Sequence, residues 1–145
     1  MLIKNVRLRN KDGIYDILIE DGSIKEISKN IEKEDKNIIE GNGNLTLPPF
    51  VEPHVHLDTI LTAGEPKWNI SGTLFEGIEI WALRKKMLTE EDVIKRATTA
   101  LKWQIANGIQ YVRTHVDITD PDLTALKALI KVREAMKEFV DMQIV

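Results

Sequence analysis

The chain has 145 residues, of which 43% are hydrophobic and 30% charged, a size and composition typical of an ordinary globular domain. Its 20 basic and 23 acidic residues are interspersed, so no basic stripe favours a nucleic-acid polymer as a partner. The absence of cysteine excludes disulfides and thiolate metal sites, and no run of about 18 apolar residues predicts a membrane span. We therefore expect a cytoplasmic protein that uses neither a membrane nor nucleic acid.

Alternation of apolar and polar residues predicts strands in the first part of the chain. Such runs lie at residues 2–8, 15–20 and 23–28. Asp21 and Gly22 form a strong hairpin signal between the second run and the third. We predict a small antiparallel β-sheet. A charged stretch over 29–44 ends in turn-forming residues, which places a domain boundary near residue 46.

Strands and helices alternate in the second part, residues 47–145. An apolar run over 45–58 has no helical period and predicts a buried strand, although prolines interrupt it. Thr89 begins a helix through a capping-box-like arrangement, and Asn107 and Gly108 end it. The expected buried face of this helix consists of Val93, Ala97, Leu101 and Ile105.

A second strand and helix follow. We predict a strand over 109–118, then a helix with Asp120 as N-cap and Pro121 at its first position, which continues to about Phe139. Its expected buried face consists of Leu123, Leu126 and Ile130. Another strand begins at residue 140.

This alternation indicates βαβ units and a parallel sheet, either open or closed as a barrel. A (β/α)₈ barrel takes about 250 residues, and roughly three β/α units fit here. Because the chain stops inside an apolar strand, we expect it to be cut from a longer polypeptide.

His54-Val55-His56 is the most informative motif. Residues two apart on a strand face the same side, so both imidazoles are able to share one metal ion. The motif by itself also fits a solvated or buried histidine pair. Its position at the end of an apolar run, before Asp58 and Thr59, places it where barrel enzymes keep their chemistry and favours the metal interpretation.

His115 and Asp117 form a second same-face pair on the following strand. They would either reach the same pocket or pack within the barrel, and we favour the structural interpretation. The chain has three histidines, so a site built from all of them leaves none as a separate proton carrier.

The loop from residue 60 to residue 74 is rich in Gly, Thr, Asn and Ser, and a long loop at this position is more often functional than not. Trp68 lies in this loop and is the tryptophan that we expect to line a pocket, whereas Trp81 and Trp103 are expected in the core. The basic run 84–86 has no acidic neighbours in sequence and predicts a solvated helix face.

Several longer segments resemble the N-terminal third of bacterial cytosine deaminases, which are members of the amidohydrolase superfamily. These segments are PPFVEPHVHLDT, SGTLFEGIEIWALRK, LKWQIANGIQYVRTHVD and LTALKA, and IEDGSIKEI resembles the N-terminal sheet of the superfamily. The resemblance implies an α/β fold: the first part of an amidohydrolase (β/α)₈ (TIM) barrel, incomplete in this chain. It also implies that the opening sheet, residues 1–46, belongs to a small β-sandwich.

The resemblance also implies a function and a site. One divalent metal ion, Fe(II) or Zn(II), is bound by His54 and His56 with a histidine and an aspartate from later strands, and Leu74 contacts the pyrimidine. The activity that the resemblance implies, for the full-length protein, is hydrolysis of cytosine to uracil and ammonia in pyrimidine salvage. The glutamate that carries protons lies beyond Val145, so no catalytic residue is expected within this chain. Asp58, Thr59, Trp68, His115 and Asp117 are further pocket candidates.

Two consequences follow from the incomplete site and the incomplete barrel. The isolated chain is expected to be an inactive fragment, because two imidazoles leave a divalent ion mostly solvated and without a positioned base. If the fragment folds, its unpaired strand edges favour a homo-oligomer. Two alternatives remain: an amidohydrolase for another cyclic amidine or amide, such as isoguanine, creatinine or a triazine, and a non-catalytic structural fragment.

Overall fold

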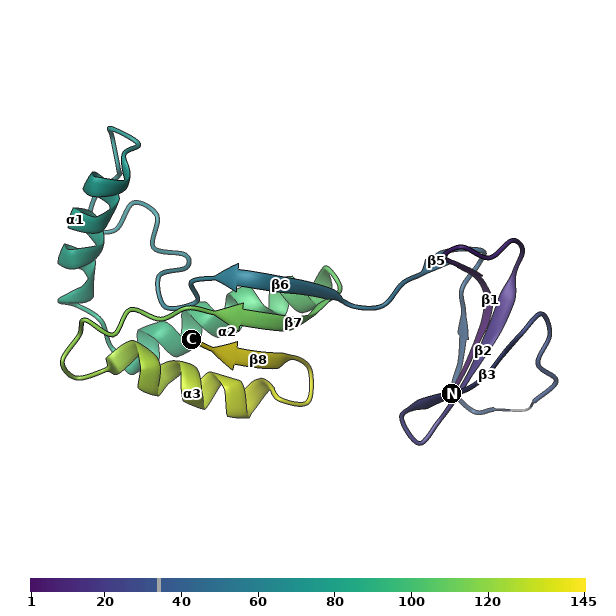
Figure 1. Cartoon of the computed structure of the whole chain (residues 1–145). Coiled ribbons are helices and arrows are strands. Elements are labelled where there is room, and N and C mark those ends of the chain that lie inside the picture. Colours follow the sequence, from purple (N-terminus) through teal and green to yellow (C-terminus); the bar gives the residue numbers. More distant parts are fainter. Residues whose placement is uncertain (34) are drawn as a thin grey trace. The chain divides into compact units, whose positions relative to one another are not determined.

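A computed structural model describes residues 1–33 and 35–145 (Figure 1). The chain divides into two compact units, Met1–Pro48 and Pro49–Val145. We describe each unit by itself. Within the described residues, no helix has both the length and the apolar character that crossing a bilayer requires.

The first unit is built on the predicted hairpins. Strands β1 (Leu2–Leu8), β2 (Tyr15–Glu20) and β3 (Ser23–Ser28) pair antiparallel in the order β3-β2-β1. Asp21 and Gly22 join β2 to β3 with φ values of 52° and 71°. Positive φ at both residues suits the right-handed twist of the strands, which explains why Asp-Gly is so strong a hairpin signal.

The three predicted strands pair antiparallel as expected, but the complete sheet of this unit is mixed because it contains two further strands that we did not predict. Strands β4 (Ile38–Glu40) and β5 (Leu45–Thr46) both pair parallel with β1. They lie in and just after the stretch that we interpreted as a charged connection. Strands this short carry no readable alternation of apolar and polar residues, and their pairing with β1 fixes them instead.

The first unit leaves much apolar surface exposed. Leu2, Leu18 and Ile31 form its buried cluster. By contrast, Ile24 is 61% exposed and Ile38 is 53% exposed. The small core is therefore accompanied by uncovered isoleucines.

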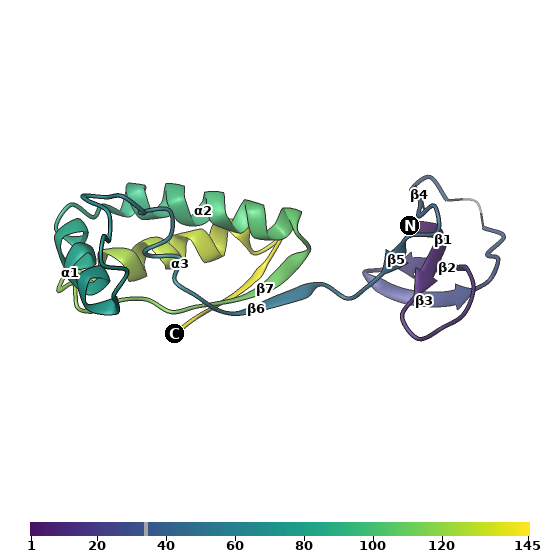
Figure 2. The ribbon, with the colours of Figure 1, turned by 90° about the horizontal axis from the view of Figure 1, so that it is seen from above.

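The second unit is an α/β layer, as predicted. Strands β6 (Phe50–Val55), β7 (Ile109–Thr114) and β8 (Asp141–Ile144) form a parallel sheet in that order. Helices α2 (Glu90–Ala106) and α3 (Thr124–Met136) lie along one face of the sheet (Figure 2). Helix α1 (Leu74–Lys85) lies beyond the carboxyl ends of β6 and β7 (Figure 1).

Strand β6 is less buried and less regular than predicted. Phe50 is 54% exposed and Val51 is 62% exposed. Helices cover one face of the sheet (Figure 2). The register between β6 and β7 shifts between Glu52 and Val55, around Pro53, which has no N–H to donate. The apolar run therefore indicated a strand correctly and its burial incorrectly.

Helix α2 agrees with the prediction at both ends and on its buried face. The Thr89 hydroxyl accepts a hydrogen bond from the backbone N–H of Asp92 at 3.2 Å. The helix ends before Gly108, whose φ of 83° suits glycine. Val93, Ala97 and Leu101 are fully buried.

Strand β7 and helix α3 differ from the prediction. The strand ends at Thr114, so His115 and Asp117 lie beyond it. The helix begins at Thr124, and Asp120 accepts the backbone N–H of Thr124 without being its N-cap. The helix ends at Met136, before Phe139.

The buried face of α3 also differs from the expected one. Leu123 is 36% exposed and Ile130 is 44% exposed. The face that packs into the core consists of Ala125, Ala128, Leu129, Val132 and Met136. This face combines two alanines with Leu129, Val132 and Met136, so the buried side of the helix is rotated from the one that we predicted.

Candidate functional site

The three histidines of the chain converge at the carboxyl end of β6. His54 lies on β6, His56 follows it, and His115 follows β7. The ring centres of His54 and His56 are 5.5 Å apart. The ring of His115 stacks on that of His54 at 4.0 Å with an interplanar angle of 25°. Parallel pairing of the two strands therefore brings these side chains together.

The ring of His115 packs against the flat face of the His54 ring. Stacked rings direct their in-plane nitrogen lone pairs side by side, and not toward a common point between the rings. Partial desolvation and the neighbouring imidazoles of His54 and His56 lower the pKa of His115, which favours its neutral form. The geometry therefore fits a packing role for His115 better than a metal-ligand role.

A buried carboxylate fixes the chain just after the histidine pair. Asp58 is fully buried and accepts the backbone N–H groups of Thr59 at 3.0 Å and Asp117 at 2.8 Å. Its Oδ1 also lies 3.6 Å from Nδ1 of His56. Asp58 thus ties the end of β6 to the segment after β7 and places a negative charge beside one face of the site.

The buried hydroxyl of Thr114 forms a second tie between the same segments. It accepts the backbone N–H of Leu57 at 3.1 Å. Both Thr114 and Leu57 are fully buried. The backbone around His56 is therefore fixed by two polar contacts, one with β7 and one with the segment after it.

A cavity of about 530 Å³ opens next to His56. Its lining combines the strand end, the long loop after β6, helix α1 and the segment after β7. Aromatic and aliphatic side chains dominate the wall, and a few polar groups face into the space. The lining includes His56, Thr59, Gly64, Trp68, Leu74, Ile78, Ile80, Trp81 and Asp117.

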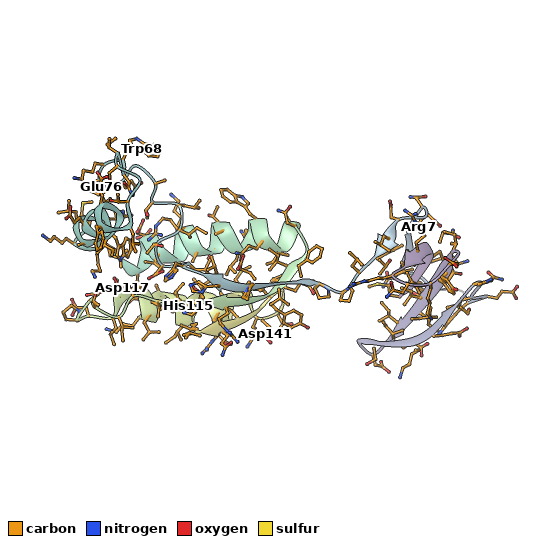
Figure 3. All side chains as sticks on the ribbon, turned by 45° about the horizontal axis from the view of Figure 1, so that its top comes forward. Arg7, Trp68, Glu76, His115, Asp117 and Asp141 are labelled. Carbon is orange, nitrogen blue, oxygen red and sulfur yellow. The ribbon has the colours of Figure 1, made fainter. Side chains whose placement is uncertain are left out.

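The structure brings together most of the residues that the sequence singled out. His56, Thr59, Trp68, Leu74 and Asp117 line the cavity. The remaining candidates, His54, His115 and Asp58, are not among its lining residues. Figure 3 shows His115 and Asp117 toward the α1 end of the sheet, with Asp141 farther from it.

Two of the expectations about tryptophan were wrong. Trp81 lines the cavity together with Trp68, because α1 turns its indole toward the segment after β7. Trp103 is 58% exposed on α2 and does not belong to the core. A helical position alone does not show which face a tryptophan occupies, so these two tryptophans were not distinguishable before the fold was known.

Helix α1 begins at the cavity rim. The Thr73 hydroxyl accepts the backbone N–H of Glu76, and the Glu76 carboxylate in turn accepts the backbone N–H of Ser71 at 2.6 Å. These contacts fix the start of the helix and leave Leu74, the first residue of α1, 75% exposed beside the cavity. The capping pattern was visible in the sequence as Thr73 followed three residues later by Glu76.

The basic run at the end of α1 is not a solvated face, which corrects our prediction. Arg84 is buried and donates to Glu65 and Asp92, each at 2.8 Å. Lys85 donates to Asp117 at 2.9 Å. The acidic partners are distant in sequence and become neighbours only in the fold.

The carboxylate of Asp117 accepts several hydrogen bonds. The indole N–H of Trp81 reaches it at 2.8 Å, and the Thr119 hydroxyl and Lys85 ammonium also bind the carboxylate. Burial opposes ionisation, but the hydrogen bonds from Lys85, Thr119 and Trp81 outweigh it and hold the pKa of Asp117 well below its usual range. Asp117 is therefore an anion at neutral pH.

The histidine pair fits part of a metal site. Two imidazoles with centres 5.5 Å apart are able to reach one ion, since each nitrogen–metal bond is about 2 Å long. In residues 1–33 and 35–145, no group of three or more His, Cys, Asp or Glu side chains is arranged to hold an ion. His54 and His56 would thus supply two ligands of a set that needs others.

The comparison with protein families identifies the class. The model of the amidohydrolase family matches residues 37–141, and the chain belongs to that family.

Two relatives are particularly similar to this chain. The solved structure of 5-methylcytosine deaminase from Klebsiella pneumoniae, liganded with 5-fluorocytosine, is 46% identical with a TM-score of 0.91. It matches 99% of this chain and 35% of its own. N-isopropylammelide isopropyl amidohydrolase from Pseudomonas sp. (strain ADP) is 35% identical over 100% of this chain and 37% of its own length.

A third relative has the same fold. The structure of N-isopropylammelide isopropylaminohydrolase from Burkholderia multivorans is 30% identical with a TM-score of 0.78 over 99% of this chain. The chain thus spans little more than a third of the length of each of these relatives. The likeness confirms the resemblance to cytosine-deaminase-type amidohydrolases.

Proposed function

We propose that this chain forms part of a metal-dependent amidohydrolase that deaminates cytosine or a 5-substituted cytosine. The observation that carries the proposal is the placement of His56 on the wall of an apolar cavity at the carboxyl end of β6, with His54 beside it. The 46% identity to a 5-methylcytosine deaminase supports this substrate class. The opening sheet would belong to a β-sandwich and the second unit to an incomplete (β/α)₈ barrel.

His54 and His56 would bind one divalent ion, Fe(II) or Zn(II), together with ligands from outside this chain. A bound divalent ion supplies an activated water nucleophile at neutral pH. The carboxylate of Asp58 lies 3.6 Å from Nδ1 of His56 and favours a proton on that nitrogen. The lone pair of Nε2 is then free to bind the metal ion. The second imidazole, that of His54, is held by stacking on His115.

The cavity wall would bind the pyrimidine. Leu74, Trp68 and Trp81 provide flat and apolar surfaces of the kind that a heteroaromatic ring contacts favourably. Because such surfaces exclude water, they also strengthen the polar contacts made to the exocyclic groups of the ring. No residue of this chain is assigned as the proton carrier.

The first test compares the polypeptide encoded by the complete reading frame with the 145-residue chain. We expect ammonia release from cytosine or 5-methylcytosine by the former and no turnover by the latter, since two imidazoles do not complete a metal site. Ammonia release by the short chain at a comparable rate would contradict the proposal.

Metal content tests the two ligands separately. His54→Ala and His56→Ala in the complete polypeptide should each remove most of the bound metal, measured by inductively coupled plasma mass spectrometry. His115→Ala is the matched control, because its ring stacks on His54 without facing a shared ion, and it should retain metal. Loss of metal from His115→Ala alone would refute this assignment.

A second candidate function is hydrolysis of a substituted triazine. The 35% identity to N-isopropylammelide isopropyl amidohydrolase over the whole chain favours it. Parallel assays with cytosine, 5-methylcytosine and N-isopropylammelide decide between the two, because the preferred substrate should show a kcat/KM at least about tenfold higher.

A further inference from the structure

Helix α1 carries much of the cavity wall but is anchored weakly by apolar contacts. Leu74, Ile78 and Trp81 all belong to this helix and all line the cavity. Leu74 is 75% exposed and Phe75 is 79% exposed. Among the twelve residues of the helix, the buried ones are Ile80 and Arg84. Hydrophobic burial is therefore too small to fix the orientation of this helix, and polar ties must do so.

The polar ties lie at the carboxyl-terminal end of the helix. Arg84 binds Glu65 and Asp92, which fastens the helix to the loop and to α2. Trp81 and Lys85 bind Asp117, which fastens the helix to the segment after β7. Both ties include residues that line the cavity: Glu65 in the first, and Trp81 and Asp117 in the second. Trp81 is the aromatic one of these residues, so the second tie fixes a flat part of the wall.

Asp117 also connects to the histidine strand. Its backbone N–H donates to Oδ2 of the buried Asp58 at 2.8 Å, and Oδ1 of Asp58 lies near Nδ1 of His56. One residue therefore contacts α1 through its side chain and the end of β6 through its backbone. Asp117 therefore lies between helix α1 and the end of β6 that carries His54 and His56.

We propose that Asp117 is a positioning residue that holds α1 against the cavity and sets the orientation of the Trp81 indole for substrate binding. The inference rests on the proposed function, because the substrate contact belongs to that site. Asp117 is expected to act through Trp81 and not to contact substrate. Loss of this tie should weaken binding of the ring more than it slows the chemical step.

The kinetic test uses the complete polypeptide with cytosine as substrate. Asp117→Ala should raise KM about tenfold while kcat falls less than about threefold, because a uniform binding contact is lost. Asp117→Asn keeps an acceptor for Trp81 but loses the charge opposite Lys85, and should lie between wild type and Asp117→Ala. Asp122→Asn is the control, since this carboxylate on the same segment makes no side-chain contact with α1.

A structural test does not depend on turnover. Hydrogen exchange measured by mass spectrometry should speed up at least about fivefold in α1 of Asp117→Asn, with α2 and α3 unchanged. Trp81→Phe, which removes the indole N–H and keeps an aromatic ring, should have a similar effect. Combining Trp81→Phe with Asp117→Ala should add little to the effect of Asp117→Ala, because Asp117→Ala already removes the contact that Trp81→Phe breaks.

The two tests separate failure of this inference from failure of the proposed function. If wild type does not deaminate cytosine but Asp117→Asn loosens α1 alone, the positioning role stands and the substrate assignment falls. If exchange in α1 is unchanged in Asp117→Asn, the inference is overturned whatever the activity. Faster exchange spread equally over α2 and α3 also overturns it, because that result indicates general destabilisation.

Discussion

At the scale of single residues, position 64 requires glycine for two separate reasons. Its φ is 86°, and a Cβ at this position would lie 3.0 Å from two ring atoms of Trp68. Glycine is therefore needed both for the backbone conformation and for the close approach of the indole that lines the cavity. The sequence showed Gly64 and Trp68 in one loop but not their contact.

Gly64→Ala should destabilise the protein by about 1 kcal/mol and displace the Trp68 ring. Gly72→Ala is the matched control: Gly72 has a φ of 68°, and a Cβ there meets nothing within 4 Å. Both variants place alanine at a positive φ, and urea unfolding measures the loss in the free energy of unfolding for each. The indole N–H resonance of Trp68 should move in Gly64→Ala alone, and equal movement in both would contradict the contact.

Prediction from sequence worked for residues whose role depends on near neighbours in the chain. The spacing of His54 and His56 and the Thr89 cap needed only local geometry. The roles of Arg84 and Trp81 were missed because their partners Asp92 and Asp117 are brought near by folding. Whether His54 and His56 bind metal stays a prediction.

At the scale of elements, a chain of charges joins α1, α2 and the long loop. Glu65, Arg84, Asp92 and Arg96 alternate in sign along it. Arg96 also donates to the backbone carbonyls of Asp58, at 2.9 Å, and Ile60. The two guanidinium groups are almost fully buried, so each depends on Asp92 for compensation.

Asp92→Ala should therefore cost about 3 kcal/mol of unfolding free energy, since it leaves two buried cations without their shared partner. Glu90→Ala, in the same turn of α2, is the control. Glu90 binds the exposed Lys131, and its loss should cost less than about 1 kcal/mol. Equal losses in urea unfolding would show that burial of the network contributes nothing.

The tie between α1 and Asp117 should depend on pH. The pKa of Asp117 in the folded protein lies below its ordinary value of 3.8, so the carboxylate stabilises the fold above about pH 4. This contribution is lost as the pH falls through the folded-state pKa. The stability difference between wild type and Asp117→Asn should be constant from about pH 7 to 5 and shrink toward about pH 2. A difference that grows on acidification would contradict this sign.

Elements with clear periodicity were predicted well, and short or irregular ones were not. Helix α2 and strands β1 to β3 combine alternation or helical spacing with strong turn and capping residues. Strands β4 and β5 are too short for a pattern, and the parallel pairing with β1 gives them their structure. The buried face of α3 was misjudged because large apolar residues lie on more than one side of this helix, and only the fold shows which side packs.

At the scale of the whole molecule, each unit exposes apolar groups and unpaired strand edges. In the second unit, Phe50, Val51 and Tyr111 lie uncovered, and β6 and β8 are the edges of the sheet. In the first unit, Ile24, Ile38 and Ile39 are exposed. Such surfaces are typical of sheets that pair with further chain or with other copies.

We propose that the 145-residue chain forms homo-oligomers that cover these surfaces. Light scattering after size-exclusion chromatography should give a mass above the 16.5 kDa of one copy. Val51→Lys should reduce the oligomer, because a charge on an edge strand opposes pairing. A monodisperse monomer at all concentrations would contradict the proposal.

The positions of the tryptophans make ligand binding in the cavity measurable by fluorescence. Trp68 and Trp81 line it, whereas Trp103 lies exposed on α2 and is not among the lining residues. A ligand that enters the cavity should quench the fluorescence of the first two and leave that of Trp103 unchanged. Because the chain contains no cysteine, one introduced thiol would carry a dye at a single defined position. Ligand entry and movement of α1 could then be followed in real time by energy transfer.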